Sequence, residues 1–97
     1  MYTIGVDYGT ESARALLVDV RDGREVATAV YSYSHGVIDH HLPDSGKPLP
    51  PDWALQDPHD YLEALWITIP KVMDQSGVPA AEVAGIAIDF TACTMLP

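Results

Sequence analysis

The sequence predicts an α/β domain in which a mixed sheet is completed by a crossover helix. The first observation is a pair of apolar runs, residues 2–7 and 13–19, rich in the Val, Ile and Leu typical of strands. The second is an Asp-Gly pair between apolar runs, which favours a hairpin. The third is a long helical pattern followed by a final apolar run.

The first half of the chain reads as three strands. Residues 2–7 and 13–19 show little polar alternation, which is expected of strands covered on both faces. Asp22 and Gly23 lie within RDGRE and turn the chain, and residues 25–33 then alternate as a third strand does. We therefore expect an antiparallel meander.

A loop and a helix follow the meander. Residues 34–55 are rich in Gly and Pro, and a loop of this length in a compact domain is usually functional or mobile. Asp57 is the expected N-cap, Pro58 the first helical residue and Gly77 the end. Apolar residues at three- and four-residue spacing predict the packed face of the helix, namely Leu62, Leu65, Trp66, Ile69, Val72 and Met73.

The last apolar run, residues 83–88, predicts a fourth strand that ends at Asp89. A strand reached by a right-handed crossover lies parallel to the first strand and is expected beside it. Asp7 and Asp89 would then leave the sheet at the same end, where α/β sheets bind ligands. The sequence therefore predicts a β-β-β-α-β unit with a ligand site at this end.

The charge of the chain argues against nucleic acid as a partner. The net charge is −9, and the five basic residues are scattered rather than clustered. The sequence shows neither a signal-peptide pattern nor an apolar run long enough to span a membrane. Cys93 is the single cysteine, so an internal disulfide is excluded. We expect a cytoplasmic protein without a membrane partner.

The segment DYGTESAR after the first strand allows two interpretations. In one, Gly9 permits a tight turn whose backbone N–H groups bind phosphate, with hydroxyl donors from Thr10 and Ser12 and a fixed charge from Arg14. Asp7 would then act through a divalent metal or its waters, because a carboxylate repels phosphate directly. In the other interpretation the segment is an ordinary hairpin with an exposed acid.

Two further groups of residues invite a chemical role. His35, His40 and His41 lie near Asp39, but their spacing matches no zinc pattern and paired cysteines are lacking, so a surface or lid loop is favoured. Cys93 has no histidine fixed in relation to it in the sequence, which favours a packing or pocket-lining residue over a nucleophile.

Several segments resemble one known family. IGVDYGTESARALLVD resembles the first phosphate motif of the actin-like ATPase superfamily, in the form used by FGGY carbohydrate kinases. WALQDPHDYLEAL is similar to that family's helix entry, and GIAIDFTACTMLP to its fourth-strand sugar-contact segment. The combination of YGTESARAL, HGVID, WALQDP and DFTACTMLP looks like the L-ribulokinase branch.

The resemblance covers essentially the whole chain but only the start of such a kinase. It implies a ribonuclease H-like (actin-like ATPase) fold, of which residues 1–97 form an incomplete part of the first, sugar-binding domain, with residues 34–55 as a loop insertion. It implies ATP-dependent phosphorylation of L-ribulose to L-ribulose 5-phosphate in L-arabinose catabolism, with ATP and Mg²⁺ as cofactors.

Roles for individual residues follow from the resemblance. Asp7 would position Mg²⁺ through water, and Arg14 would lie near the β- and γ-phosphates. Gly9, Thr10 and Ser12 would form the phosphate-binding turn.

The sugar would contact Ala92, Cys93 and Thr94, at a place where many relatives carry a charged or polar pair instead of Ala92 and Cys93. The family's catalytic base, adenine pocket and second phosphate loop belong to later segments. We therefore expect the isolated chain to be inactive. Because its strands look buried on both faces and a single helix is available to cover them, we also expect it to self-associate.

Two other classes of protein remain as alternatives. Asp7 and Asp89 at neighbouring strand ends suit a ribonuclease H-like nuclease with two metals, although the acidic charge argues against it. A non-catalytic actin-like ATPase module would share the phosphate turn, but it leaves WALQDP and DFTACTMLP unexplained.

Overall fold

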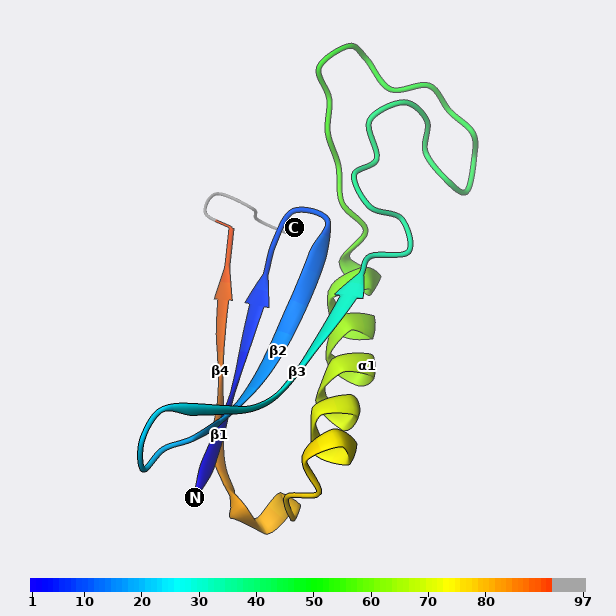
Figure 1. Cartoon of the computed structure of the whole chain (residues 1–97). Helices are drawn as coiled ribbons and strands as arrows, with labels where there is room; N and C mark the ends of the chain where they lie inside the picture. Colours follow the sequence, from blue (N-terminus) through cyan, green and yellow to red (C-terminus); the bar gives the residue numbers. More distant parts are fainter. Residues whose placement is uncertain (92–97) are drawn as a thin grey trace.

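The computed structural model describes residues 1–91 and shows a mixed four-stranded sheet with one long helix on one face (Figure 1). Strands β1 (Tyr2–Tyr8), β2 (Ser12–Asp19) and β3 (Arg24–Ser32) form an antiparallel meander. Strand β4 (Val83–Phe90) pairs parallel to β1, so the order is β3-β2-β1-β4. The predicted α/β fold class is confirmed.

The crossover from β3 to β4 consists of helix α1 (Pro58–Ser76) and the short 3-10 helix η1 (Ala80–Glu82). It returns the chain to the start of the sheet, so that β4 runs in the direction of β1. The carboxyl ends of β1 and β4, the β1–β2 turn and the first turn of α1 all lie at the upper end of the sheet in Figure 1, below the long loop. This arrangement gathers the sequence-predicted site residues of the described part at one end of the sheet.

Helix α1 begins and ends where the sequence predicts. The Asp57 carboxylate accepts a hydrogen bond from the His59 N–H at 2.9 Å, and Pro58 occupies the first turn, where its missing N–H costs little. Gly77 ends the helix in a left-handed conformation (φ 68°), and its N–H donates to the Met73 carbonyl at 3.0 Å. The helices within residues 1–91 are not long and apolar enough to cross a membrane.

The predicted packed face of α1 is partly wrong. The residues that are fully buried repeat every fourth position and are mostly small or polar: Asp60, Ala64, Thr68 and Val72. Leu62 and Trp66, expected in the core, are 50% and 62% exposed. Small side chains let the helix approach β2 and β3 closely, and this rotates the larger apolar residues toward the flanks.

The core lies between α1 and one face of the sheet. Alternate residues of the strands point toward the helix and are buried: Ile4, Val6 and Tyr8 of β1, Ala13, Ala15 and Leu17 of β2, and Ala29 of β3. Within residues 1–91 no helix covers the opposite face. The expectation that the first strands are covered on both faces is therefore not met in the described part.

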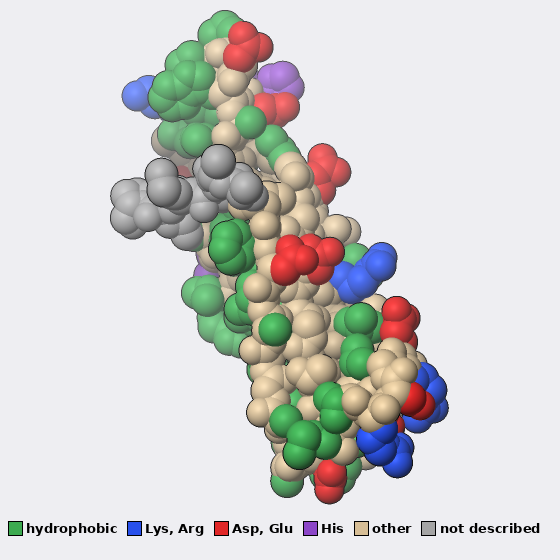
Figure 2. Space-filling view, turned by 90° about the vertical axis from the view of Figure 1, so that its left-hand side faces the viewer, with side chains coloured by type: hydrophobic (Ala, Val, Ile, Leu, Met, Phe, Trp, Pro, Cys, Tyr) green, Lys and Arg blue, Asp and Glu red, His purple; other side chains and the backbone are tan. Residues whose placement is uncertain are grey.

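Strand β4 forms an apolar edge of the sheet. Ile86, Ile88 and Phe90 pair with Ile4, Val6 and Tyr8 and so face the same side, yet they are 53%, 51% and 70% exposed. The reason is that α1 packs mainly on β2 and β3 and leaves the β4 edge largely uncovered. Figure 2 faces this edge and shows hydrophobic side chains exposed along it.

The long loop spans residues 33–57 and projects beyond the sheet (Figure 1). It doubles back on itself, because Ile38 and Leu55 exchange two backbone hydrogen bonds of 2.8 Å. Further along the loop, the Leu49 N–H donates to the His40 carbonyl at 2.8 Å. The loop therefore returns to the sheet at a fixed place, directly before α1.

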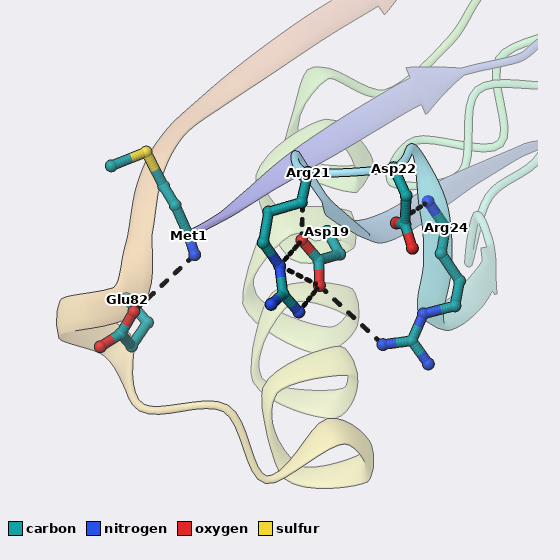
Figure 3. A network of polar contacts seen from close by, with 6 residues as sticks. All are labelled: Met1, Asp19, Arg21, Asp22, Arg24 and Glu82. Atoms are coloured by element: carbon teal, nitrogen blue, oxygen red, sulfur yellow. Dashed lines mark hydrogen bonds and ion pairs between the residues drawn. The ribbon is translucent and has the colours of Figure 1, made fainter.

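Asp19 closes the other end of the sheet (Figure 3). Its buried carboxylate accepts hydrogen bonds from the backbone N–H of Arg21 at 3.0 Å and from the Arg21 guanidinium at 2.6 Å, while an Arg24 nitrogen lies 3.9 Å away. These hydrogen bonds from Arg21 hold the pKa of Asp19 well below its usual range. The turn between β2 and β3 is thus held by hydrogen bonds to the buried Asp19 carboxylate.

We expect Asp19→Asn to lower the melting temperature at neutral pH. Because the folded-state pKa is lowered, the ionised carboxylate stabilises the fold above its ordinary pKa of 3.8, and this stabilisation is lost as the pH falls below that value. The difference between variant and native protein should therefore shrink as the pH falls below about 4. Thermal unfolding across pH measures it, with Asp22→Asn in the same turn as the control. A difference that is constant with pH would contradict this account.

Candidate functional site

The sheet face opposite α1 has a shallow depression of about 360 Å³ near the carboxyl ends of β1 and β4. Asp7 of β1 lies between Arg14 of β2 and Asp89 of β4, because these residues are direct partners in the two strand pairings. The depression is also lined by small residues, Gly5 and Ala87, which leave room above the sheet. The strand pairing therefore brings two carboxylates and one guanidinium to the same hollow.

The two carboxylates lie where a cation can bind between adjacent strands. Neighbouring strands lie about 4.8 Å apart, so ionised Asp7 and Asp89 on adjacent strands repel each other. Within residues 1–91, the Asp7 side chain forms no hydrogen bond or ion pair, and no group of three or more metal-binding side chains occurs. A site with few protein ligands suits Mg²⁺, which keeps several waters.

The turn between β1 and β2 is closed by a short internal contact. The Gly9 N–H donates to the Ser12 carbonyl at 2.8 Å, and a Cβ atom on residue 9 would lie only 3.0 Å from that same oxygen. Glycine is therefore needed because the backbone approaches itself. Thr10 and Glu11 are exposed at the tip, and within the described part of the chain their N–H groups donate to no protein acceptor.

The carbonyl groups of this turn are held from the protein side. The Tyr33 hydroxyl donates to the Gly9 carbonyl at 2.8 Å, and the Gln56 side-chain amide donates to the Thr10 carbonyl at 2.6 Å. The Tyr33 N–H donates to the Glu11 carbonyl at 3.0 Å. Neither Tyr33 nor Gln56 was expected from the sequence to support the turn, although Gln56 lies within the WALQDP segment.

A cluster of tyrosines connects the turn to the helix. The rings of Tyr8 and Tyr33 each meet Tyr61 edge to face, with centroids 5.5 and 5.7 Å apart. The Tyr8 hydroxyl donates to the Tyr61 carbonyl at 2.7 Å. Burial, together with the neighbouring Tyr61 and Tyr8, raises the pKa of Tyr33 to about 12, so this residue stays a neutral donor.

Asp60, in the first turn of α1, also holds the long loop in place. Its role is therefore more than the favourable interaction of an acid with a helix N-terminus. The buried Asp60 carboxylate accepts from the backbone N–H of His35 at 3.1 Å and contacts the His35 Nδ1 at 3.0 Å. Asp60 raises the pKa of His35, so the charged pair stabilises the fold at low pH and is lost as the pH rises through that pKa. The His40 imidazole lies 3.6 Å from the Asp39 carboxylate.

The structure thus brings some of the sequence-predicted site residues together at one end of the sheet. Asp7 and Arg14 lie in the depression, and Gly9, Thr10 and Ser12 form or flank the turn beside it. Ala92, Cys93 and Thr94 lie outside the described residues.

Comparison with known proteins decides the family. Residues 2–95 match the N-terminal domain of the FGGY family of carbohydrate kinases. The chain belongs to the FGGY family. Ribulokinase of Shouchella clausii is 62% identical over 99% of this chain, and ribulokinase of Halalkalibacterium halodurans is 58% identical over 99%. Ribulokinase of Mycolicibacterium smegmatis is 49% identical over 98%.

The chain spans 17% of the length of each of these relatives. The family match includes Asp7 and Asp89, the pair of acids on which the nuclease alternative rested. It also agrees with the four-stranded sheet and crossover helix as an incomplete ribonuclease H-like, actin-like ATPase unit. The roles of the individual site residues remain predictions.

Proposed function

We propose that this sequence belongs to a cytoplasmic ATP-dependent ribulokinase, which converts L-ribulose to L-ribulose 5-phosphate in L-arabinose catabolism. The observation that carries the proposal is the 62% identity to the ribulokinase of Shouchella clausii along 99% of the chain. The geometry supports it, since the Asp7 carboxylate, the Arg14 guanidinium and a turn with two N–H groups that have no acceptor within residues 1–91 lie at one end of the sheet.

In this proposal the described residues hold the phosphates of ATP. The N–H groups of Thr10 and Glu11, which have no acceptor among the described residues, donate to phosphate oxygens, and Arg14 adds a fixed positive charge. Asp7 fits a water-mediated contact to Mg²⁺, which would neutralise the phosphate charge when bound. The donor set therefore suits a metal–nucleotide complex better than a metal bound by protein alone.

The Asp7→Asn variant of the full-length protein tests this assignment. We expect kcat on L-ribulose to fall on the order of 10²- to 10³-fold, because charge neutralisation and positioning supply most of phosphoryl-transfer catalysis. Asp74→Asn, an exposed acid on α1, is the matched control and should behave as the native protein does. Near-native turnover of Asp7→Asn in steady-state kinetics would remove Asp7 from the mechanism.

We also propose that Ala92, Cys93 and Thr94 line the sugar site, as the family resemblance implies. Enlarging Ala92 to Leu should then raise the KM for L-ribulose about tenfold or more by steric exclusion, and leave the KM for ATP unchanged. Ala84→Leu, near the start of β4, is the control for added volume on the same segment. Equal losses for both substrates, or no loss for either, would place Ala92 outside the sugar pocket.

We propose further that the 97-residue chain alone self-associates and transfers no phosphoryl group. The exposed apolar side chains of β4 and the open edge of the sheet support pairing with a second copy. Light scattering should show an oligomer that Ile88→Lys weakens, whereas Ile67→Lys on α1, also partly exposed, should not. A monomeric native chain would contradict the packing argument, and L-ribulose-dependent ADP release would contradict the proposed inactivity.

A further inference from the structure

The side chain of Gln56 joins the turn to the helix. Its amide nitrogen donates to the Thr10 carbonyl at 2.6 Å, and its amide oxygen accepts a hydrogen bond from the Tyr61 hydroxyl. Both polar atoms of the amide are therefore used. The Thr10 carbonyl can only accept, so it requires the amide nitrogen on the side of the turn, and the Tyr61 hydroxyl then holds the amide oxygen. The contact crosses 46 residues of sequence, from the end of the long loop to the β1–β2 turn.

The backbone that carries Gln56 is held on both sides. Leu55, the preceding residue, exchanges two hydrogen bonds of 2.8 Å with Ile38, and Asp57, the following residue, caps α1. Gln56 itself is half-buried. A side chain that extends from such a fixed backbone position can hold its partner in one place, so Gln56 acts as a support for the turn.

Because the peptide group is planar, the hydrogen bond that holds the Thr10 carbonyl also sets the direction of the next N–H group. In a trans peptide the carbonyl of one residue and the N–H of the next point in opposite directions. Gln56 draws the Thr10 carbonyl toward the protein, so the Glu11 N–H points away from it. Tyr33 does the same to the Gly9 carbonyl, which turns the Thr10 N–H outward.

We infer that Gln56 is a positioning residue for the nucleotide phosphates, since it orients the Thr10–Glu11 peptide so that its N–H faces the bound phosphate. The inference rests on the proposed function, in which this turn binds ATP. It adds a residue outside the phosphate motif to the nucleotide site, and it makes Tyr61 the residue that holds the Gln56 amide oxygen in place.

Variants of the full-length protein test the inference. Gln56→Leu keeps a similar volume and removes both hydrogen bonds. We expect it to weaken MgADP binding, measured by calorimetry, and to raise the KM for ATP, each about 5- to 10-fold, the usual effect of losing one or two hydrogen bonds. The KM for L-ribulose should not change. Gln56→Glu should be more damaging, because a carboxylate would face the Thr10 carbonyl.

Two further variants separate positioning from stability. Tyr61→Phe keeps the ring and removes only the hydroxyl that holds the Gln56 amide oxygen, so it should reproduce part of the Gln56→Leu effect on MgADP. Gln75→Leu, an exposed glutamine on α1, is the matched control and should leave MgADP affinity unchanged. A lower melting temperature of Gln56→Leu with native MgADP affinity would overturn the inference, and so would equal losses for MgADP and L-ribulose.

The result for Asp7→Asn distinguishes failure of this inference from failure of the proposed function. If Asp7→Asn abolishes turnover while Gln56→Leu binds MgADP as the native protein does, the inference alone is overturned. If neither variant changes turnover or MgADP affinity, the turn is not the nucleotide site and both proposals fail. Loss of turnover in Asp7→Asn together with selective weakening of MgADP binding in Gln56→Leu supports both.

Discussion

Strand β1 pairs with β2 on one side and with β4 on the other, and every candidate functional group depends on this double pairing. The antiparallel partner supplies Arg14 and the tight turn, and the parallel partner supplies Asp89. Asp7 is fixed between them, on the face that α1 leaves open. A one-residue slip of either pairing would move these side chains to the other face, because successive residues of a strand alternate.

A second set of contacts gives the turn its orientation. Tyr33 comes from the chain just after β3, and Gln56 from the chain just before α1, so the two ends of the long loop both reach the same turn. His35 and Asp60 hold the first part of that loop to the helix. The loop is therefore part of the support of the candidate phosphate site. We expect changes in the conformation of the loop to alter the orientation of the β1–β2 turn.

Much of this fold follows from local sequence patterns. The Asp-Gly turn, the helix caps at Asp57 and Gly77 and the strand positions are local features, and they agree with the structure within two residues. The parallel β1–β4 pair follows from crossover handedness. The rotation of α1, which exposes Leu62 and Trp66, depends on which small residues meet the sheet, and the Gln56–Thr10 contact depends on where a long loop ends. Neither is encoded in a local pattern.

The most direct test is a crystal structure of the full-length protein with Mg²⁺ and a non-hydrolysable ATP analogue. The account predicts phosphate oxygens within hydrogen-bond distance of the Thr10 and Glu11 N–H groups. It also predicts a Mg²⁺-bound water on the Asp7 carboxylate, and a Gln56 amide still bonded to the Thr10 carbonyl. Nucleotide phosphates bound elsewhere, with these N–H groups left to solvent, would contradict the assignment of this end of the sheet as the nucleotide site.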